Sequence, residues 1–348
     1  MSLNRRKFIA STAFSLAAGA LGSTVLTAAK SEEKNKYSAG SKTTNLLADL
    51  GPLKQIKAGV LNVGYHESGP SDGQPVILMH GFPFDVHAYS QVAPILAAQG
   101  CRIIVPYLRG FGPTRFLQAE TIRSGQQGAL VTDLRNLMDA LSIPTAILGG
   151  YDWGGRAAAG VALIWPERCS GLVSVNGYAI LDLPHFNIPA SPKQEQSIWF
   201  MYYFLSQRGE AGYRKNRLEI NKMLWQTFSP KWAFDDTTFN LTAAAFNNPD
   251  HVDVVIHSYR HRYGITQGDP AYAAIESVFA KQLPITVPII TLDGQDDGVR
   301  PPNDGTAYAD KFTGPRTHRI IPGSGHNLPQ EKPQAFADAV MELIKNKK

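Results

Sequence analysis

The chain has 348 residues, of which 43% are hydrophobic and 18% are charged, and its formal net charge is +5 at pH 7. This composition is typical of a globular protein with a substantial core. Three basic residues lie in the first 29 positions, so the remaining 31 basic and 29 acidic residues give a net charge of only +2. Because no stripe of basic residues is interleaved with aromatic ones, the sequence argues against a nucleic-acid partner.

The first 29 residues are typical of a twin-arginine export signal. Arg5, Arg6 and Lys7 precede a mildly apolar run that ends in small residues, with cleavage expected after Ala29 or, as second choice, Ala20. An N-terminal membrane anchor or a frayed helix is the alternative, but Ser, Thr and Gly in the run make a poor permanent transmembrane helix. We therefore predict a periplasmic or secreted protein, not stably inserted in a membrane after cleavage. Residues 30–53 form a flexible polar leader in this interpretation.

Short apolar segments alternate with helical patterns along residues 54–182 and 271–348. Continuous apolar strands separated by helices predict an α/β fold, a mostly parallel sheet with helices on both faces. Strands are expected at residues 59–67, 75–81, 102–107, 145–151, 171–177, 287–294 and 316–326, and helices near 87–99, 124–141, 154–165 and 331–345.

The alternation stops between residues 183 and 270. The chain there becomes helical and aromatic, as in SIWFMYYFLSQRGEAGYRKNRLEINKMLWQTF and HVDVVIHSYRHRYG. A segment of this length is the size of a helical cap inserted into the sheet domain. We expect the cap to lie over the strand ends, where open parallel sheets bind ligands.

The two cysteines, Cys101 and Cys169, each lie just before a different predicted strand. Export would permit a disulfide, but two buried free thiols fit these positions better. The sequence has no CxxC pair and no Cys/His cluster, so it predicts neither a metal site nor a cofactor.

The segment LGGYDWGGRAAAG places Asp152 between a predicted strand and a predicted helix. Gly150, Gly154 and Gly155 permit a sharp strand-to-helix turn that exposes one side chain at the edge of the sheet. This turn is the nucleophile elbow, usually seen as G-x-S-x-G. Taken alone, Asp152 could equally be an ordinary N-cap of the following helix.

Three further segments place chemical groups at predicted strand ends. HGFP follows a strand at the point where the amides of Phe82 and Trp153 could hold a developing oxyanion. GSGHNLPQEKP places His326 after the last strand. TLDGQDDGVRPP places Asp297 after the preceding strand, with Asp296 as second choice for the acid. The order nucleophile, acid, histidine is the chain order of the α/β-hydrolase fold.

As a set, these segments resemble the epoxide hydrolase and haloalkane dehalogenase branch of the α/β-hydrolases, from about Gln55 to Lys345. The matching pieces are HGFPFDVHAYS, VPYLRGFGPTRF, GGYDWGGRAAA, GQDD and GHNLPQEKP. Tyr107 departs from the pattern, since relatives usually carry Asp before the Leu-Arg-Gly turn. The resemblance implies an α/β-hydrolase fold with an inserted cap and a catalytic triad of Asp, His and Asp.

An aspartate nucleophile suits displacement at a saturated carbon. Attack by a carboxylate on an ester or amide would give an anhydride, whereas attack on a saturated carbon gives an ordinary alkyl ester. Water activated by His326, itself oriented by Asp297, would then hydrolyse the ester on Asp152. The sequence thus predicts a hydrolase that opens an epoxide or cleaves a carbon–halogen bond.

An epoxide oxygen needs a proton donor, and the resemblance implies a pair of cap tyrosines. Tyr259 stands at one of these positions, but Phe200 stands at the other. Either one phenol suffices, or Tyr202 or Tyr203 reaches the oxygen from a shifted helix. The aromatic cap also predicts a small hydrophobic substrate, with Trp153, Trp199, Phe200 and Tyr203 as contacts.

A halide needs N–H donors instead, for which Trp153 and Trp199 are the candidate indoles. Phe82 stands where haloalkane dehalogenases often carry Asn, and Trp153 stands where haloacetate dehalogenases carry Arg, which leaves Arg156 as a weak carboxylate clamp. The sequence therefore favours hydrolysis of an epoxide to a vicinal diol, with a dehalogenase as the alternative. A non-catalytic ligand-binding protein of the same fold is a third hypothesis.

Overall fold

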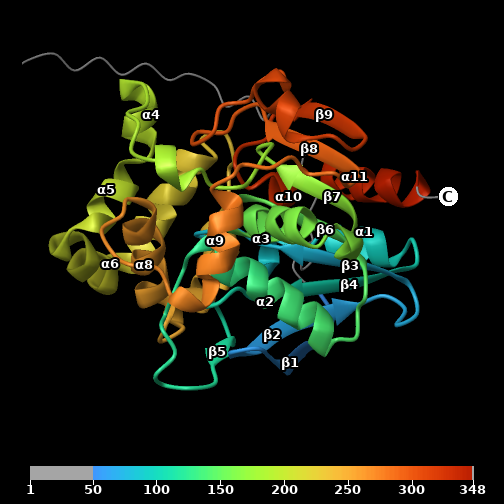
Figure 1. Cartoon of the computed structure of the whole chain (residues 1–348), viewed down its shortest axis with the longest axis horizontal. Coiled ribbons are helices and arrows are strands. Elements are labelled where there is room, and N and C mark those ends of the chain that lie inside the picture. Colours follow the sequence, from blue (N-terminus) through green and yellow to red (C-terminus); the bar gives the residue numbers. More distant parts are fainter. Residues whose placement is uncertain (1–49, 347–348) are drawn as a thin grey trace, which may run out of the picture. The chain divides into compact units, whose positions relative to one another are not determined.

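The computed structural model describes residues 50–346 of the chain (Figure 1). The export signal predicted at residues 1–29 and most of the predicted leader lie outside these residues. The leader was expected to run to residue 53, but the first strand already begins at Leu53. Within the described residues, no helix is both long and apolar enough to cross a membrane.

The described residues form one nine-stranded, mostly parallel sheet. The strands are β1 (Leu53–Ala58), β2 (Leu61–Ser68), β3 (Gln74–Met79), β4 (Cys101–Pro106), β5 (Arg115–Phe116), β6 (Ala146–Gly150), β7 (Cys169–Val175), β8 (Ile289–Gly294) and β9 (Arg316–Ile321). Their order is β1-β2-β4-β3-β6-β7-β8-β9, and β5 pairs with β2. Strand β2 runs antiparallel to its neighbours, whereas every pair from β4–β3 to β8–β9 is parallel.

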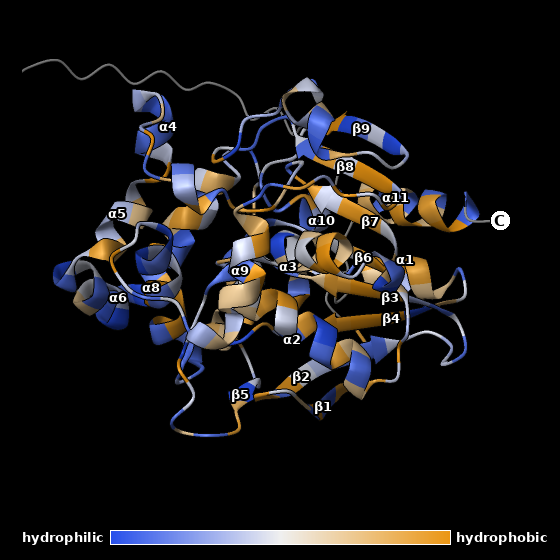
Figure 2. Ribbon diagram, viewed as in Figure 1, coloured by the Kyte–Doolittle hydropathy of each residue, from blue (hydrophilic) through white to orange (hydrophobic). Residues whose placement is uncertain are grey.

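Helices cover both faces of this sheet. Helices α1 (Val92–Ala97) and α11 (Pro333–Lys345) pack together on one face, and α2 (Gln127–Ala140), α3 (Asp152–Ile164) and α9 (Ala273–Phe279) lie on the other (Figure 1). Central strands such as β3 and β6 are apolar along their length, as Figure 2 shows, because side chains pack on both of their faces. The predicted α/β fold is therefore confirmed. Shorter helices are α10 (Leu328–Glu331) and the 3-10 turns Val86–Tyr89, Pro166–Arg168, Pro270–Tyr272 and Thr306–Lys311.

The elements that were not expected from the sequence include β1, β5 and α9. Strand β1 has the sequence LKQIKA, which contains no continuous apolar run because most of the strand is exposed to solvent and needs none. Strand β5 has two residues and α9 has seven, too few for a periodic pattern. The last strand ends at Ile321, and the rest of the predicted strand is a loop that contains His326.

The segment predicted as a cap is helical and packs on the sheet domain through aromatic side chains. Trp225 stacks on Phe84 with ring centroids 4.7 Å apart, and its indole N–H donates to the Pro83 carbonyl at 2.7 Å. In Figure 1 these helices lie beside one end of the sheet. They are α4 (Pro192–Ser197), α5 (Trp199–Leu205), α6 (Gln207–Phe228), α7 (Asp236–Ala243) and α8 (His251–Arg262), with 3-10 turns at Leu183–His185 and Ala244–Asn247.

The Leu-Arg-Gly turn after β4 has a structural role. Arg109 is fully buried and makes a bidentate ion pair with Asp133 of α2, with N–O distances of 2.6 and 2.7 Å. This pair ties the turn to α2, because a guanidinium and a carboxylate match in two parallel hydrogen bonds. Elsewhere in the core, Cys101 and Cys169 are both buried and unpaired.

Helix α3 approaches the end of β3 so closely that only glycine fits at one position. A Cβ atom at Gly154 would lie 2.0 Å from the Met79 carbonyl oxygen and 2.5 Å from that of His80. At the next residue, Gly155, the nearest atom would be the Gly150 carbonyl oxygen at an ordinary 3.4 Å. The start of α3 is therefore held against the sheet at Gly154.

We expect Gly154→Ala to destabilise the fold and Gly155→Ala not to. The first substitution forces two backbone segments apart, and overpacking of this kind costs about 1–3 kcal/mol or more. The second adds a methyl group at ordinary van der Waals distance from its neighbours, and alanine is favoured over glycine within a helix by up to about 1 kcal/mol. Urea unfolding of the two variants measures the difference, and equal midpoints would contradict this account of the packing.

Candidate active site

Asp152 lies in a sharp turn between β6 and α3. Its φ is 48°, in the left-handed region that residues with a Cβ atom rarely adopt. The HGFP loop passes directly alongside, because a Cβ atom at Gly81 would lie 2.7 Å from the Asp152 Cβ. The N-cap of α3 is Tyr151, and the Asp152 carboxylate accepts from the Phe82 amide of another loop and from no backbone amide of the helix. The structure thus favours the nucleophile elbow over the N-cap interpretation.

The two carboxylate oxygens of Asp152 have different surroundings. Oδ1 accepts a hydrogen bond from the Phe82 amide at 2.9 Å. Oδ2 lies 3.3 Å from Arg156 Nη2 and 4.0 Å from His326 Nε2. One oxygen therefore occupies the position predicted for an oxyanion, and the other faces the histidine. Within the described residues the Trp153 amide makes no hydrogen bond to this carboxylate, so its part in the oxyanion hole stays a prediction.

His326 pairs with Asp297 and not with the neighbouring acid. His326 Nδ1 lies 2.8 Å from Asp297 Oδ2, while Asp296 pairs with Lys231 at 2.6 Å. The amide of Asn176 donates to the same Asp297 oxygen at 3.0 Å. The backbone amides of residues 299 and 300 donate to the other oxygen, each at 2.8 Å. The carboxylate of Asp297 is thus fixed from several sides, and it orients the imidazole ring.

The charges of this group are mutually stabilising. Burial alone would raise the pKa of the Asp152 carboxyl, but the nearby Arg156, His326 and Arg262 lower it below its ordinary value. Burial alone would likewise lower the pKa of His326, but Asp297 and Asp152 raise it. At neutral pH an ionised carboxylate therefore lies beside an imidazole that takes up a proton more readily than free histidine. Within residues 50–346 no group of three or more His, Cys, Asp or Glu side chains could hold a metal ion.

Comparisons with known proteins agree with this geometry. Residues 74–333 match the family model described as the alpha/beta hydrolase fold. A solved structure from Klebsiella pneumoniae, of a protein provisionally assigned as an epoxide hydrolase, is 50% identical with a TM-score of 0.83, and the match covers 84% of this chain and 97% of that one. Epoxide hydrolase A of Mycobacterium tuberculosis is 23% identical over 305 residues, which cover 80% of this chain and 92% of that protein. A haloalkane dehalogenase of Psychrobacter cryohalolentis is 33% identical over 116 residues, 33% of this chain and 38% of that protein.

The chain belongs to the α/β-hydrolase fold family. The resemblance to the epoxide hydrolase and haloalkane dehalogenase branch is confirmed by these relatives, and the predicted class of enzyme, an α/β-hydrolase, is confirmed with it.

Two of the predicted cap residues of this hydrolase lie beside the HGFP loop. Tyr259 is buried, and its ring centroid is 5.8 Å from that of Phe82 and 6.2 Å from that of Trp153. The ring of Phe200 packs 5.5 Å from Tyr259 and 6.4 Å from Phe82. Burial is the main reason that the pKa of Tyr259 is raised, so its phenol stays protonated at neutral pH.

Three other predicted cap residues are not brought to the nucleophile. Tyr202 is 43% exposed, and its hydroxyl donates to Glu195 on the preceding helix. The side chains of Tyr203 and Trp199 pack on each other with centroids 5.9 Å apart, and Tyr203 lies against α6. The reason is helical periodicity, since α5 turns Phe200 and Phe204 inward and its other aromatic residues away. The expected roles of Tyr202 as proton donor and of Tyr203 and Trp199 as substrate contacts are not supported by these positions.

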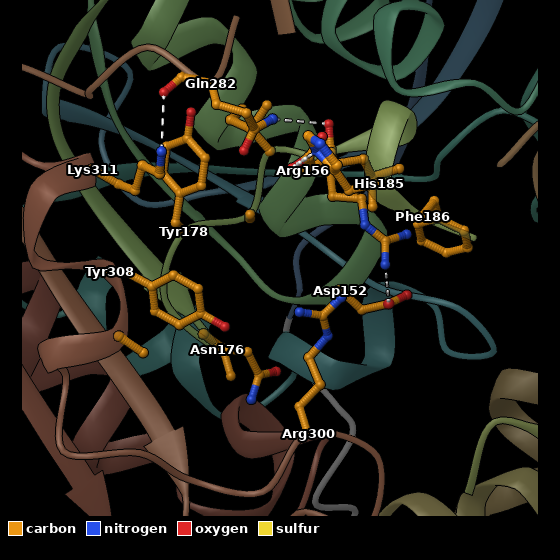
Figure 3. A pocket seen from close by; sticks show the side chains of 16 residues that line it. Asp152, Arg156, Asn176, Tyr178, His185, Phe186, Gln282, Arg300, Tyr308 and Lys311 are labelled. Atoms are coloured by element: carbon orange, nitrogen blue, oxygen red, sulfur yellow. Dashed lines mark hydrogen bonds and ion pairs between the residues drawn. The ribbon is translucent and has the colours of Figure 1, made fainter. Parts of the chain in front are cut away.

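Arginine side chains, which sequence reasoning underrated, gather around Asp152. A cavity of about 460 Å³ is lined by Asp152, Arg156 and Arg300, together with polar groups such as Asn176 (Figure 3). Arg262 lies over the ring of Tyr259, with its guanidinium 4.6 Å from the ring centre. The sequence predicts a hydrophobic substrate, but the cavity lining is polar and charged. Two of these arginines could have been found from helical spacing. Arg156 follows Asp152 by four residues on α3, and Arg262 follows Tyr259 by three on α8, so each pair lies on one face of its helix.

We expect Asp297→Asn to lower the pKa of His326, because the variant removes the charge that raises it. In the wild type the pKa of His326 lies above the ordinary value of 6.5, so the ring becomes neutral only when the pH rises past this raised pKa. Titration of the imidazole nitrogens by NMR measures both values. Asp296→Asn is the matched control, because that carboxylate pairs with Lys231. An equal shift in both variants would contradict the assignment of Asp297.

Proposed function

We propose that this hydrolase opens an epoxide through a covalent ester on Asp152 and releases a vicinal diol. The observation that supports this proposal best is the different surroundings of the two carboxylate oxygens. An oxygen held by a backbone amide is suited to carry charge in a tetrahedral intermediate. The other oxygen, which faces His326, is suited to attack carbon.

In the first step, Oδ2 of Asp152 attacks a ring carbon of the epoxide and the bond from that carbon to the ring oxygen breaks. The released alkoxide takes a proton, and Tyr259 is the proposed donor. Its phenol is protonated at neutral pH, and its ring packs in the cap against those of Phe82 and Trp153. The product of this step is an alkyl ester of Asp152 that carries a new hydroxyl group.

In the second step, His326 takes a proton from water, and the hydroxide formed attacks the Asp152 carbonyl carbon. The oxyanion develops at the Oδ1 position and is stabilised by the Phe82 amide and, in this proposal, by that of Trp153. The intermediate collapses, and the diol leaves with the former Oδ2 atom and takes the proton that His326 holds. The second proton of the attacking water passes from the restored Asp152 carboxyl to the Tyr259 phenolate, so both groups return to their starting states. Asp297 stabilises the imidazolium that forms in this step.

A dehalogenase remains the second candidate, because the same carboxylate would displace a halide and form the same kind of ester. The cluster of arginines beside Asp152 favours it, since guanidinium N–H groups can stabilise a departing anion. The ester distinguishes the two functions by mass, because epoxide opening retains every substrate atom and dehalogenation loses the halogen.

We also propose that the reaction takes place outside the cytoplasm. The support is the twin-arginine pattern at Arg5 and Arg6 with the small residues that follow. Fractionation of cells that express the full chain tests this, with Arg5→Lys/Arg6→Lys as the variant expected to remain in the cytoplasm.

The His326→Gln variant is expected to accumulate the ester, because it keeps the nucleophile and loses the base. Intact-mass measurement after incubation with an epoxide should show a gain equal to the whole substrate, and peptide mapping should place it on Asp152. The double variant with Asp152→Ala is the control and should gain nothing. If haloalkanes add the mass of their alkyl group and epoxides add no mass, the enzyme is a dehalogenase and not an epoxide hydrolase.

Tyr259→Phe is expected to slow ester formation from an epoxide by about 10²-fold or more, the usual contribution of a general acid. It should leave hydrolysis of an ester already formed nearly unchanged, since Tyr259 acts only on the ring oxygen. Rapid-mixing measurement of the two steps separates these effects. Equal slowing of both would mean that Tyr259 only supports the cap.

A further inference from the structure

Three guanidinium groups from three different elements lie near one carboxylate that lines the cavity. Arg156 comes from α3, Arg262 from the end of α8, and Arg300 from the loop that follows Asp297. Figure 3 shows Arg156 and Arg300 directed toward the Asp152 carboxylate. Among the described residues, the only carboxylate within 4.0 Å of any of these guanidinium groups is Asp152, which Arg156 contacts.

Two of these three guanidinium groups are buried, and that of Arg156 lacks a full set of hydrogen-bond partners. Arg156 is 5% exposed, and its buried Nη1 atom has no hydrogen-bond partner in the described structure. Arg262 is 4% exposed and donates to the Ser258 hydroxyl at 2.9 Å. Burial lowers the pKa of both side chains, and the other guanidinium groups nearby lower it further. Arginine nevertheless stays protonated in proteins, so the cluster carries charge that one aspartate cannot balance.

The rest of the cavity lining does not supply the missing negative charge. Lys311 and His185 also line it, and the one further acid in the lining is Asp182. Asp182 accepts a hydrogen bond from the His185 ring at 2.9 Å and is partly exposed. The wall of the cavity therefore has more positive than negative groups, and an anion that entered would offset the excess.

We propose that the substrate is an epoxide that bears a carboxylate on the ring carbon or one bond away from it. This proposal rests on the proposed function. The carboxylate is the anion of choice because a planar guanidinium holds it through two parallel hydrogen bonds. The short link follows from distance, because Arg156 Nη2 lies only 3.3 Å from the attacking oxygen. An anion bound by the same guanidinium must therefore be attached close to the carbon that is attacked.

Arg156 also gives such a substrate an advantage in the first step. In the substrate-free structure Arg156 hydrogen-bonds to Oδ2, and a hydrogen bond to a carboxylate oxygen makes it a weaker nucleophile. A substrate carboxylate competes for this guanidinium and leaves Oδ2 free to attack. A neutral epoxide offers no such replacement, so it meets a nucleophile that is still hydrogen-bonded to Arg156.

The test compares oxirane-2-carboxylate with oxirane-2-carboxamide, which have the same ring and nearly the same shape. The wild type should hydrolyse the carboxylate with a kcat/KM about 10²-fold or more above that of the amide, since a site built for a polar group discriminates strongly against its absence. Arg300→Gln should reduce this ratio at least about tenfold, mainly through the KM for the carboxylate. Arg300 is the informative position because its guanidinium does not contact Asp152 within 4.0 Å. Arg208→Gln, on the exposed side of α6, is the matched control and should keep the ratio.

A second measurement does not depend on turnover. The product 2,3-dihydroxypropanoate should bind the Asp152→Ala variant more tightly than 2,3-dihydroxypropanamide does, as measured by calorimetry, and Arg300→Gln in that background should remove the difference. Equal binding of acid and amide would overturn the anion site even if a variant lost activity through misfolding.

The outcomes also separate this inference from the proposed function. If styrene oxide and the amide react as well as the carboxylate, epoxide hydrolysis stands and the anion site is overturned. A second outcome is that, in the His326→Gln variant, 2-chloropropanoate forms an ester on Asp152 whereas 2-chloropropanamide and the epoxides do not. In that case the carboxylate site stands, and the substrate is a halide and not an epoxide. If none of these compounds reacts and none of the acids binds, both proposals are overturned.

Discussion

The close contact between the start of α3 and the end of β3 is the constraint on which the active site depends. Because Gly154 has no side chain, the helix begins directly against the carbonyl groups of Met79 and His80. The chain has one residue in which to turn from β6 into this helix, and that residue, Asp152, takes the left-handed conformation. The cost of this conformation is of order 1–3 kcal/mol, and packing on both sides of the turn offsets it. The turn then directs the carboxylate toward the Phe82 amide and the cavity.

The charges around this carboxylate follow from the same burial. A buried aspartate would ordinarily take up a proton, and the nearby cations prevent this. Asp152 in turn helps to raise the pKa of His326. When the carboxylate becomes an ester its charge disappears, and the imidazole loses one of the groups that favour its protonated form. In the proposed mechanism the first step therefore prepares the base for the second, because His326 must be neutral to take a proton from water.

The sequence predicts the parts of the fold and site that depend on local pattern. The apolar strands, the glycines around Asp152 and the strand-end positions of His326 and Asp297 are all readable within short segments. The choice between Asp296 and Asp297 is not, because it depends on which carboxylate the loop turns inward. The orientation of α5 is also not local, since the packing of Phe200 and Phe204 decides which aromatic residues face the site. Arg262 and Arg300 come from separate elements, and only the tertiary fold brings them near Asp152.

The polarity of the substrate is the property that the sequence predicts least well. The cap is rich in aromatic residues, which suggested an apolar ligand. In the structure many of these rings pack on one another or on the sheet domain, as Trp225 does on Phe84 and Phe204 does on Tyr213. Aromatic content in the cap therefore reflects how a small helical layer is held in place. The substrate meets the side chains that line the cavity, and the charged groups around Asp152 act over a longer range than the apolar ones. The charges of the cavity lining, and not the composition of the cap, therefore indicate what this hydrolase binds.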